Sequence, residues 1–295
     1  MTLILQASNA DKVFSAQTQD IIDCWQRSFG IDIARIFEDT QSIDFYVCRR
    51  SGIGFFDPAP LGDGPFYAEL QKIDWYYLRD KWEYAQALAS ASENERILEV
   101  GCGEGAFLAF AAEMGHRPSG LELNAAAAVA ARAAGLDVSQ TDLVEVAAVT
   151  PQGFDRVVAF QVLEHVRDPV AFTRAMIACT KPGGRVGVAV PNAESFISWE
   201  PRNLLDMPPH HATRWTASAL RWLGEHLGAS PIVIRPGPLE PIHVDWFLAL
   251  MFRNRHLKRT VGKLSRPVLR RVLHAGAGRL ISGHTIYAEY TVPAS

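Results

Sequence analysis

The sequence predicts an α/β fold built around a parallel sheet, and three observations support this prediction. Residues 97–100 form a short apolar run, followed by three glycines at alternate positions and an apolar segment at 107–112. This order indicates a strand, a tight turn and a helix. Strand-like and helix-like segments then alternate from residue 118 to residue 234. Of the 295 residues, 48% are hydrophobic and 21% are charged, which is ordinary for a globular protein with a large core.

The first 92 residues precede this unit and contain several shorter elements. Alternation of apolar and polar residues at 43–47 predicts a strand, and 53–56 is its expected hairpin partner. The density of proline and glycine at 57–65 predicts a loop. We expect helical segments at 21–25, 31–37 and 66–91.

After the glycine turn, strands and helices are expected to follow one another in simple alternation. The predicted strands are 97–100, 118–123, 136–138, 154–160, 185–190, 231–234 and 285–292. The predicted helices are 107–112, 125–134, 168–180 and 216–227. Asp168 followed by Pro169, and Thr216, are typical of helix starts. This alternation is the pattern of a parallel sheet.

The glycine turn is the first candidate binding site, and two ligands fit its pattern. Gly101, Gly103 and Ala106 match a dinucleotide-binding turn, as in an NAD-dependent oxidoreductase. Glu99 with glycines 101, 103 and 105 matches a turn for S-adenosylmethionine (SAM). Glu99 and Glu104 would repel a pyrophosphate, whereas the ammonium and sulfonium groups of SAM tolerate nearby carboxylates. The sequence therefore favours SAM over NAD.

Two further acids follow later strands. Glu122 lies 21 positions beyond Gly101, where an acid accepts hydrogen bonds from ribose hydroxyls in open α/β sheets. That role suits NAD as well as SAM. Asp142 follows the third predicted strand, where it meets an adenine amino group or caps the next helix.

Taken together, these residues resemble the class I SAM-dependent methyltransferases. The motifs that carry the resemblance are Glu99-x-Gly101-x-Gly103-x-Gly105, Glu122, Asp142, residues 154–157 through 163–166, and Lys181-Pro182-Gly183-Gly184. The resemblance covers about residues 93–238 and the last strand. It implies a Rossmann-like, doubly wound, seven-stranded mixed sheet whose last strand inserts antiparallel beside the fifth.

The resemblance also implies a domain organisation and a set of cofactor-binding residues. Residues 1–92 resemble the cap or substrate regions of bacterial relatives, 93–240 the SAM-binding core, 241–283 a helical insertion and 284–295 the last core strand. We expect the SAM site to be lined by Glu99, Gly101, Cys102, Gly103, Gly105, Glu122, Leu123, Asp142, Leu143 and Gln161.

The expected activity is methyl transfer from SAM to a small-molecule or glycan-type acceptor, with oxygen as the expected acceptor atom. Catalysis then depends mainly on positioning, and a hydroxyl acceptor must also lose its proton. His165 follows the fourth strand and is a candidate base, because an unperturbed imidazole titrates near neutrality. His210 and His211 lie in the loop after the fifth strand and are further candidates. The alternative for His165 is a helix-start histidine with a structural hydrogen bond, and one of His210 and His211 is expected to be simply exposed.

No bound metal is expected. Gln161-x-x-Glu164-His165 resembles the metal-binding Glu-x-x-Glu-His of ubiquinone-pathway O-methyltransferases, but Gln161 is a neutral and poorer ligand for a hard cation. Cys24 and Cys48 lack the partners of a zinc ribbon.

The four widely spaced cysteines, together with the lack of a leader-like or membrane-spanning run, suggest a reduced, cytoplasmic protein.

The segment 246–280 is strongly basic. It contains nine Lys and Arg residues and no acid, which leaves 20 basic and 32 acidic residues elsewhere. Apolar residues at helical spacing (Leu257, Val261, Leu264, Val268 and Val272) predict two amphipathic helices broken near Pro267. The segment is either a packed helix pair with a solvated basic face or a contact for an anionic ligand or membrane surface.

Nucleic acid is not expected as a partner, because the rest of the chain is acidic. A non-catalytic SAM-binding partner protein that uses these helices is a further alternative, and the sequence does not indicate an oligomeric state.

Overall fold

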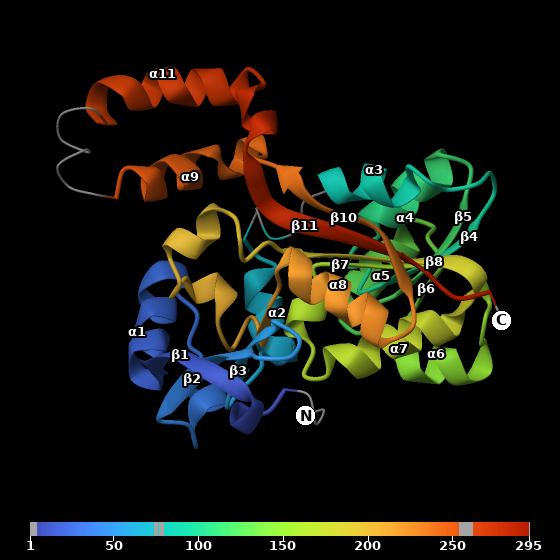
Figure 1. The fold of residues 1–295 in the computed structure, drawn as a ribbon, viewed down its shortest axis with the longest axis horizontal. Coiled ribbons are helices and arrows are strands. Elements are labelled where there is room, and N and C mark those ends of the chain that lie inside the picture. Colours follow the sequence, from blue (N-terminus) through green and yellow to red (C-terminus); the bar gives the residue numbers. More distant parts are fainter. Residues whose placement is uncertain (1–4, 74–75, 77–79, 254–261, 295) are drawn as a thin grey trace.

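The computed structural model describes all residues except 1–4, 74–75, 77–79, 254–261 and 295. Its main feature is a seven-stranded sheet with the order β10-β11-β8-β7-β4-β5-β6 (Figure 1). The strands are β4 Arg96–Val100, β5 Arg117–Leu121, β6 Val138–Ser139, β7 Phe154–Phe160, β8 Thr180–Pro191, β10 Ser230–Pro238 and β11 Ser282–Thr291. The strands from β6 to β8 are parallel, and β11 pairs antiparallel with both β8 and β10. The predicted seven-stranded mixed sheet with an antiparallel last strand is thereby confirmed.

Helices cover both faces of this sheet. The helices are α3 Trp82–Leu88, α4 Ala106–Glu113 and α5 Ala125–Ala133 on one face, and α6 Leu143–Val149, α7 Pro169–Cys179 and α8 Ala217–His226 on the other. Adjacent residues of a central strand point to opposite faces, so Val157 packs with α7 and Val158 with α4. This two-sided burial explains why β7 is a continuous apolar run in the sequence.

The N-terminal region forms a second sheet with the order β1-β2-β3-β9. Its strands are β1 Ala10–Gln17, β2 Ser42–Cys48, β3 Gly54–Asp57 and β9 Thr213–Arg214. Helix α1 Thr18–Phe29 packs on it through Ile21 and Trp25. The hairpin predicted at 43–47 and 53–56 is confirmed as the β2–β3 pair. The fourth strand, β9, comes from the loop after β8, so the two sheets are joined by a segment remote in sequence.

Two local expectations were wrong, and one strand was not predicted. The unpredicted strand is β1, in which half of the residues are exposed and burial does not alternate. The helical pattern at 66–91 divides into α2 Gly64–Leu70, which starts at the Asp63 cap, and the separate helix α3. The segment 31–37 contains only a single 3₁₀ turn, Ala34–Phe37.

The insertion between β10 and β11 contains α9 Val244–Met251 and α11 Gly262–His274, which extend away from the end of the sheet (Figure 1). The predicted break near Pro267 was wrong: Pro267 lies inside α11, where it removes one backbone donor without ending the helix. Val268 and Val272 are exposed, and Leu273 packs inward instead. Leu257 and Val261 lie outside the described residues. Within the described chain no helix has both the length and the apolarity needed to cross a membrane.

Candidate functional site

A cavity of about 2280 Å³ opens along the edge of the sheet where the parallel strands end. It extends from the glycine turn after β4 to the loops after β7 and β8, and α2 contributes to its wall. Ordinary small-molecule sites occupy roughly 300–1,000 Å³. This cavity therefore has room for a cofactor and a second ligand side by side.

All the residues singled out from the sequence line this one cavity. The ten expected cofactor residues are Glu99, Gly101, Cys102, Gly103, Gly105, Glu122, Leu123, Asp142, Leu143 and Gln161, and the three expected catalytic residues are His165, His210 and His211. Glu99 lies near the end of β4, and the others follow β4, β5, β6, β7 and β8, whose carboxyl ends meet at the same edge. The topology thus brings together side chains that are far apart in the sequence.

The glycine turn requires glycine for both conformation and packing. Gly101, Gly103 and Gly105 all have positive φ angles, of 74°, 54° and 84°. A Cβ on Gly101 would lie 2.5 Å from a methyl group of Val162, and one on Gly105 would collide with Leu136. The backbone nitrogen of Gly101 donates to the carbonyl of Leu121 at 2.7 Å, which fixes the turn against the end of β5.

Two acids face the cavity beside this turn, in different environments. Glu122 accepts hydrogen bonds from the backbone nitrogens of Gly103 at 2.8 Å and Asn124 at 2.7 Å. Glu99 is 3% exposed, and its Oε2 atom has no hydrogen-bond partner among the described residues. Burial raises the pKa of Glu99 to about 8, partly offset by the positive charge of Lys81.

The unpartnered oxygen of Glu99 is a test of which cofactor fits. Burying an ionised carboxylate without a hydrogen-bond partner costs free energy. The site therefore favours a ligand with a cationic group or a hydrogen-bond donor at this position. The ammonium group of SAM is such a group, whereas a pyrophosphate is not. The donors and acceptors at the glycine turn therefore fit SAM.

The remaining cofactor-side residues have visible structural roles as well. Asp142 caps α6 by accepting a hydrogen bond from the nitrogen of Val144 at 2.7 Å, so the capping alternative is confirmed. Gln161 has a positive φ of 57°, and its side-chain nitrogen lies 3.4 Å from the buried carboxylate of Glu83. Leu123 is exposed, and Cys102 and Leu143 are buried.

The three histidines form a single cluster at the other end of the cavity. The ring of His165 lies 4.8 Å from the rings of both His210 and His211, and these two rings are stacked at 4.4 Å. His165 belongs to the 3₁₀ turn Leu163–His165 after β7, and the other two belong to the loop after β8. Both His210 and His211 are buried, which contradicts the expectation that one of them is simply exposed.

Each histidine is held through its Nδ1 atom. His165 Nδ1 lies 2.6 Å from the carbonyl oxygen of His210, and His210 Nδ1 lies 2.8 Å from that of Leu205. His211 Nδ1 lies 3.1 Å from a carboxylate oxygen of Asp206. Because these oxygens accept hydrogen bonds, each Nδ1 carries the proton and each Nε2 carries a lone pair.

Burial keeps these imidazoles neutral. It lowers the pKa of His165 to about 4, and it also holds the pKa of His210 and His211 well below the ordinary imidazole value, with the neighbouring imidazoles contributing. The titration near neutrality expected for His165 was therefore wrong, because that expectation assumed an unperturbed ring.

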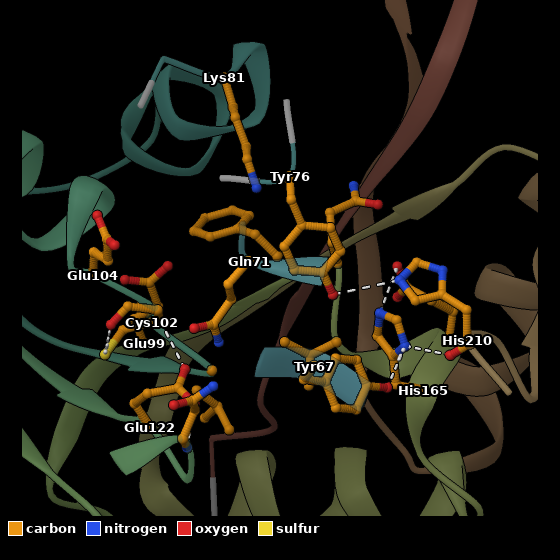
Figure 2. A pocket seen from close by; sticks show the side chains of 18 of the residues that line it. Tyr67, Gln71, Tyr76, Lys81, Glu99, Cys102, Glu104, Glu122, His165 and His210 are labelled. Atoms are coloured by element: carbon orange, nitrogen blue, oxygen red, sulfur yellow. Dashed lines mark hydrogen bonds and ion pairs between the residues drawn. The ribbon is translucent and has the colours of Figure 1, made fainter. Parts of the chain in front are cut away.

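Three residues around this cluster were not among the predicted site residues, although Glu164 belongs to the motif Gln161-x-x-Glu164-His165. Glu164 is 1% exposed and neither of its carboxylate oxygens has a hydrogen-bond partner among the described residues. Tyr67 and Tyr76 come from the N-terminal region, and their hydroxyls lie 3.2 Å from His165 Nδ1 and 3.4 Å from His210 Nε2 (Figure 2). Only Glu164 had a signal in the sequence, its position beside His165 in the Glu-His pair.

Comparison with known proteins agrees with the geometry. A family model described as a methyltransferase domain matches residues 72–232. A probable S-adenosylmethionine-dependent methyltransferase of Mycolicibacterium smegmatis is 32% identical over 161 residues, which cover 54% of this chain and 61% of that protein. A ubiquinone biosynthesis O-methyltransferase of Bordetella pertussis is 34% identical over 122 residues, which cover 39% of this chain and 51% of that protein. The chain thus spans between half and two thirds of these relatives.

Among solved structures, a SAM-dependent methyltransferase from Archaeoglobus fulgidus superposes with a TM-score of 0.54 at 17% identity. The match covers 76% of this chain and 99% of that one. At this level of identity the likeness is one of fold.

Proposed function

Because this chain belongs to the class I SAM-dependent methyltransferases, with SAM as its cofactor, we propose that it methylates an oxygen atom of a small-molecule or glycan-type acceptor. Methyl transfer requires the acceptor atom to lie in line with the methyl–sulfur bond, so both ligands must share one site. The observation that carries the proposal is the single cavity, which has Glu99, Glu122 and the glycine turn at one end and the histidine cluster at the other.

The acceptor half of the cavity favours a hydroxyl group. Imidazole Nε2 lone pairs and the phenol groups of Tyr67 and Tyr76 offer hydrogen-bond acceptors and donors to such a group (Figure 2). The ubiquinone biosynthesis O-methyltransferase relatives also support oxygen as the acceptor atom. We assign His165, His210 and His211 to acceptor orientation, and residues 1–92 to a cap that closes over the acceptor.

The test is turnover with hydroxyl-bearing acceptors, measured as formation of demethylated SAM and of a methylated product by mass spectrometry. His165→Ala is expected to lower turnover about 10²-fold while SAM affinity is retained, because loss of an orienting contact misplaces the acceptor. His226→Ala is a matched control, because His226 is an exposed residue of α8 outside the cavity. Methylation of amines but not of hydroxyls would overturn the choice of acceptor atom, and tight binding of NAD in place of SAM would overturn the cofactor.

We also propose that the basic insertion contacts an anionic membrane surface. Arg271 and Arg279 are exposed there, and so are three apolar side chains: Val268 at 59%, Val272 at 48% and Leu280 at 90%. Apolar side chains beside basic ones favour a lipid surface over a soluble anion, because headgroups and acyl chains satisfy both. An acceptor carried on a lipid is consistent with this arrangement.

A further inference from the structure

We propose that Glu164, His165, His210 and His211 bind a divalent transition-metal ion at the acceptor end of the cavity. One nitrogen from each of the three histidines lies within 4.8 Å of the others. Oε1 of Glu164 lies 3.9 Å from His165 Nε2 and 4.0 Å from His211 Nε2. Glu164 thus adds a carboxylate oxygen beside two of the three histidines.

The orientation of the rings is the second observation. Every Nδ1 atom of the cluster is already bound to an oxygen: the carbonyls of His210 and Leu205 and the carboxylate of Asp206. In metal sites a ligating histidine donates its other ring nitrogen to a carbonyl or carboxylate in this way, which fixes the tautomer and the ring orientation. The Nε2 atoms of His165 and His211 are therefore available to coordinate an ion, and His210 Nε2, which lies 3.4 Å from the Tyr76 hydroxyl, would exchange that contact for the ion.

Glu164 supplies the third observation. Its carboxylate is buried, and neither oxygen has a hydrogen-bond partner among the described residues. The neighbouring Nε2 atoms carry no proton, so the histidines cannot donate to it. An ionised, buried carboxylate beside the Nε2 lone pairs of His165 and His211 is unfavourable unless a cation lies between them.

The donor set narrows the choice of ion. Three imidazole nitrogens and one carboxylate oxygen suit Zn²⁺, Mn²⁺ or Fe²⁺ and disfavour Ca²⁺, which prefers oxygen ligands. Zinc–nitrogen bonds of roughly 2.0–2.1 Å place neighbouring ligands roughly 3.3 Å apart, so a modest closing of the cluster suffices.

This inference reverses the expectation drawn from the sequence. That expectation rested on Gln161, which stands where the resembling motif has its first acid. In the structure Gln161 contacts Glu83 instead, and His210 and His211 supply the missing ligands. They lie 45 or more positions beyond His165, so local spacing does not show them.

The catalytic consequence rests on the proposed function, whereas metal binding does not. A bound divalent ion lowers the pKa of a coordinated hydroxyl and fixes its position. The histidine lone pairs then orient the ion and do not serve as bases.

The experiment is titration of tag-free, chelator-stripped protein with Zn²⁺ by calorimetry and with Co²⁺ by visible absorption, without acceptor. We expect one ion per chain, visible bands for bound Co²⁺, and no response to Ca²⁺. Glu164→Gln and His211→Ala are expected to weaken Zn²⁺ binding at least 10–100-fold. His226→Ala removes an imidazole outside the cluster and should bind as the parent does. Circular dichroism identifies variants that fail to fold, and Glu164→Gln, which preserves side-chain volume, guards against that outcome.

The proposal is overturned if the folded parent binds neither Zn²⁺ nor Co²⁺, or if the cluster variants bind as tightly as His226→Ala. Its failure is distinguishable from failure of the proposed function. Methylation of hydroxyls by protein that binds no metal would remove only the metal site. Metal binding without any hydroxyl methylation would remove only the assigned reaction.

Discussion

The carboxylate of Glu122 lies 2.8 Å from the backbone nitrogen of Gly103, 19 residues earlier in the chain. Its other oxygen accepts a hydrogen bond from the nitrogen of Asn124 at 2.7 Å. These two bonds connect the loops after β4 and β5, which are adjacent parallel strands. The acid is thereby held at the mouth of the glycine turn before any cofactor arrives.

Glu122→Ala is expected to weaken SAM binding roughly tenfold or more. Loss of hydrogen bonds to a charged acceptor costs about 1.5–3 kcal/mol, and each 1.4 kcal/mol is about tenfold in affinity. Isothermal titration calorimetry with SAM measures the change. Glu93→Ala is the control, because Glu93 is exposed and outside the cavity. Unchanged affinity in folded Glu122→Ala would show that this acid does not contact SAM.

Gly101→Ala is expected to lower both stability and SAM affinity. The substitution places a Cβ at a φ of 74° and 2.5 Å from Val162. Gly115→Ala is the matched control, because Gly115 has a φ of 85° but no atom near the added Cβ, so it isolates the backbone cost of about 1 kcal/mol. Chemical denaturation should show a larger loss for Gly101→Ala, partly recovered by adding Val162→Ala. Equal losses at the two positions would contradict the packing argument.

SAM binding is expected to release a proton from Glu99 near pH 6.5. Burial holds the pKa of this carboxyl at about 8, so it is protonated there in the free protein, and a cationic ligand beside it favours the ionised form. The release should diminish above pH 8, where the group is already ionised. Calorimetry in two buffers with different ionisation enthalpies measures it. Glu99→Gln should abolish the difference between buffers, and a parent protein without such a difference would refute the assignment.

Glu289→Ala is expected to lower the free energy of unfolding by about 3 kcal/mol, the lower end of the range for a broken buried ion pair, because the buried charge of Arg156 keeps only one of its two acids. Arg156 is fully buried and lies 2.6 Å from Glu289, with Glu95 as its second acid at 3.0 Å. Glu69→Ala is the control: it removes the exposed pair with Lys72 and should cost at most about 1 kcal/mol. Urea denaturation of both variants measures the difference. Equal losses of stability in Glu289→Ala and Glu69→Ala would mean that the buried pair contributes no more than the surface pair.

Full-length protein is expected to co-sediment with vesicles containing anionic lipid and not with neutral ones. The basic and apolar side chains of the insertion supply both components of the interaction. Leu280→Ser combined with Val268→Ser should reduce binding severalfold, because both side chains are exposed and their loss leaves the core unaffected. Val129→Ser, at an exposed position of α5, is the matched control. Equal binding to neutral and anionic vesicles would contradict the proposal.

The sequence by itself determined the core sheet and the cofactor half of the cavity. Each signal there is local: apolar runs such as 154–160 become β7, and a glycine turn must follow β4. In a parallel sheet the strand ends meet at one edge, so Gly103 and Glu122 come together once the strands pair. The positions of these residues, together with the strand order implied by the resemblance to the methyltransferases, were enough to predict that they meet.

Only the tertiary structure decided the histidine end of the cavity. Tyr67 meets His165 across 98 positions, and Tyr76 meets His210 across 134. Local sequence patterns also failed to predict strand β1 and the unbroken helix around Pro267. Hydrophobic periodicity and turn preferences are patterns of a few neighbouring residues. The cluster of Glu164 with three histidines forms instead because the loop after β8 packs against the turn after β7. Burial also sets the charge of each ionisable group in this cluster. The burial of a side chain depends on what surrounds it in space and not on its neighbours in the sequence.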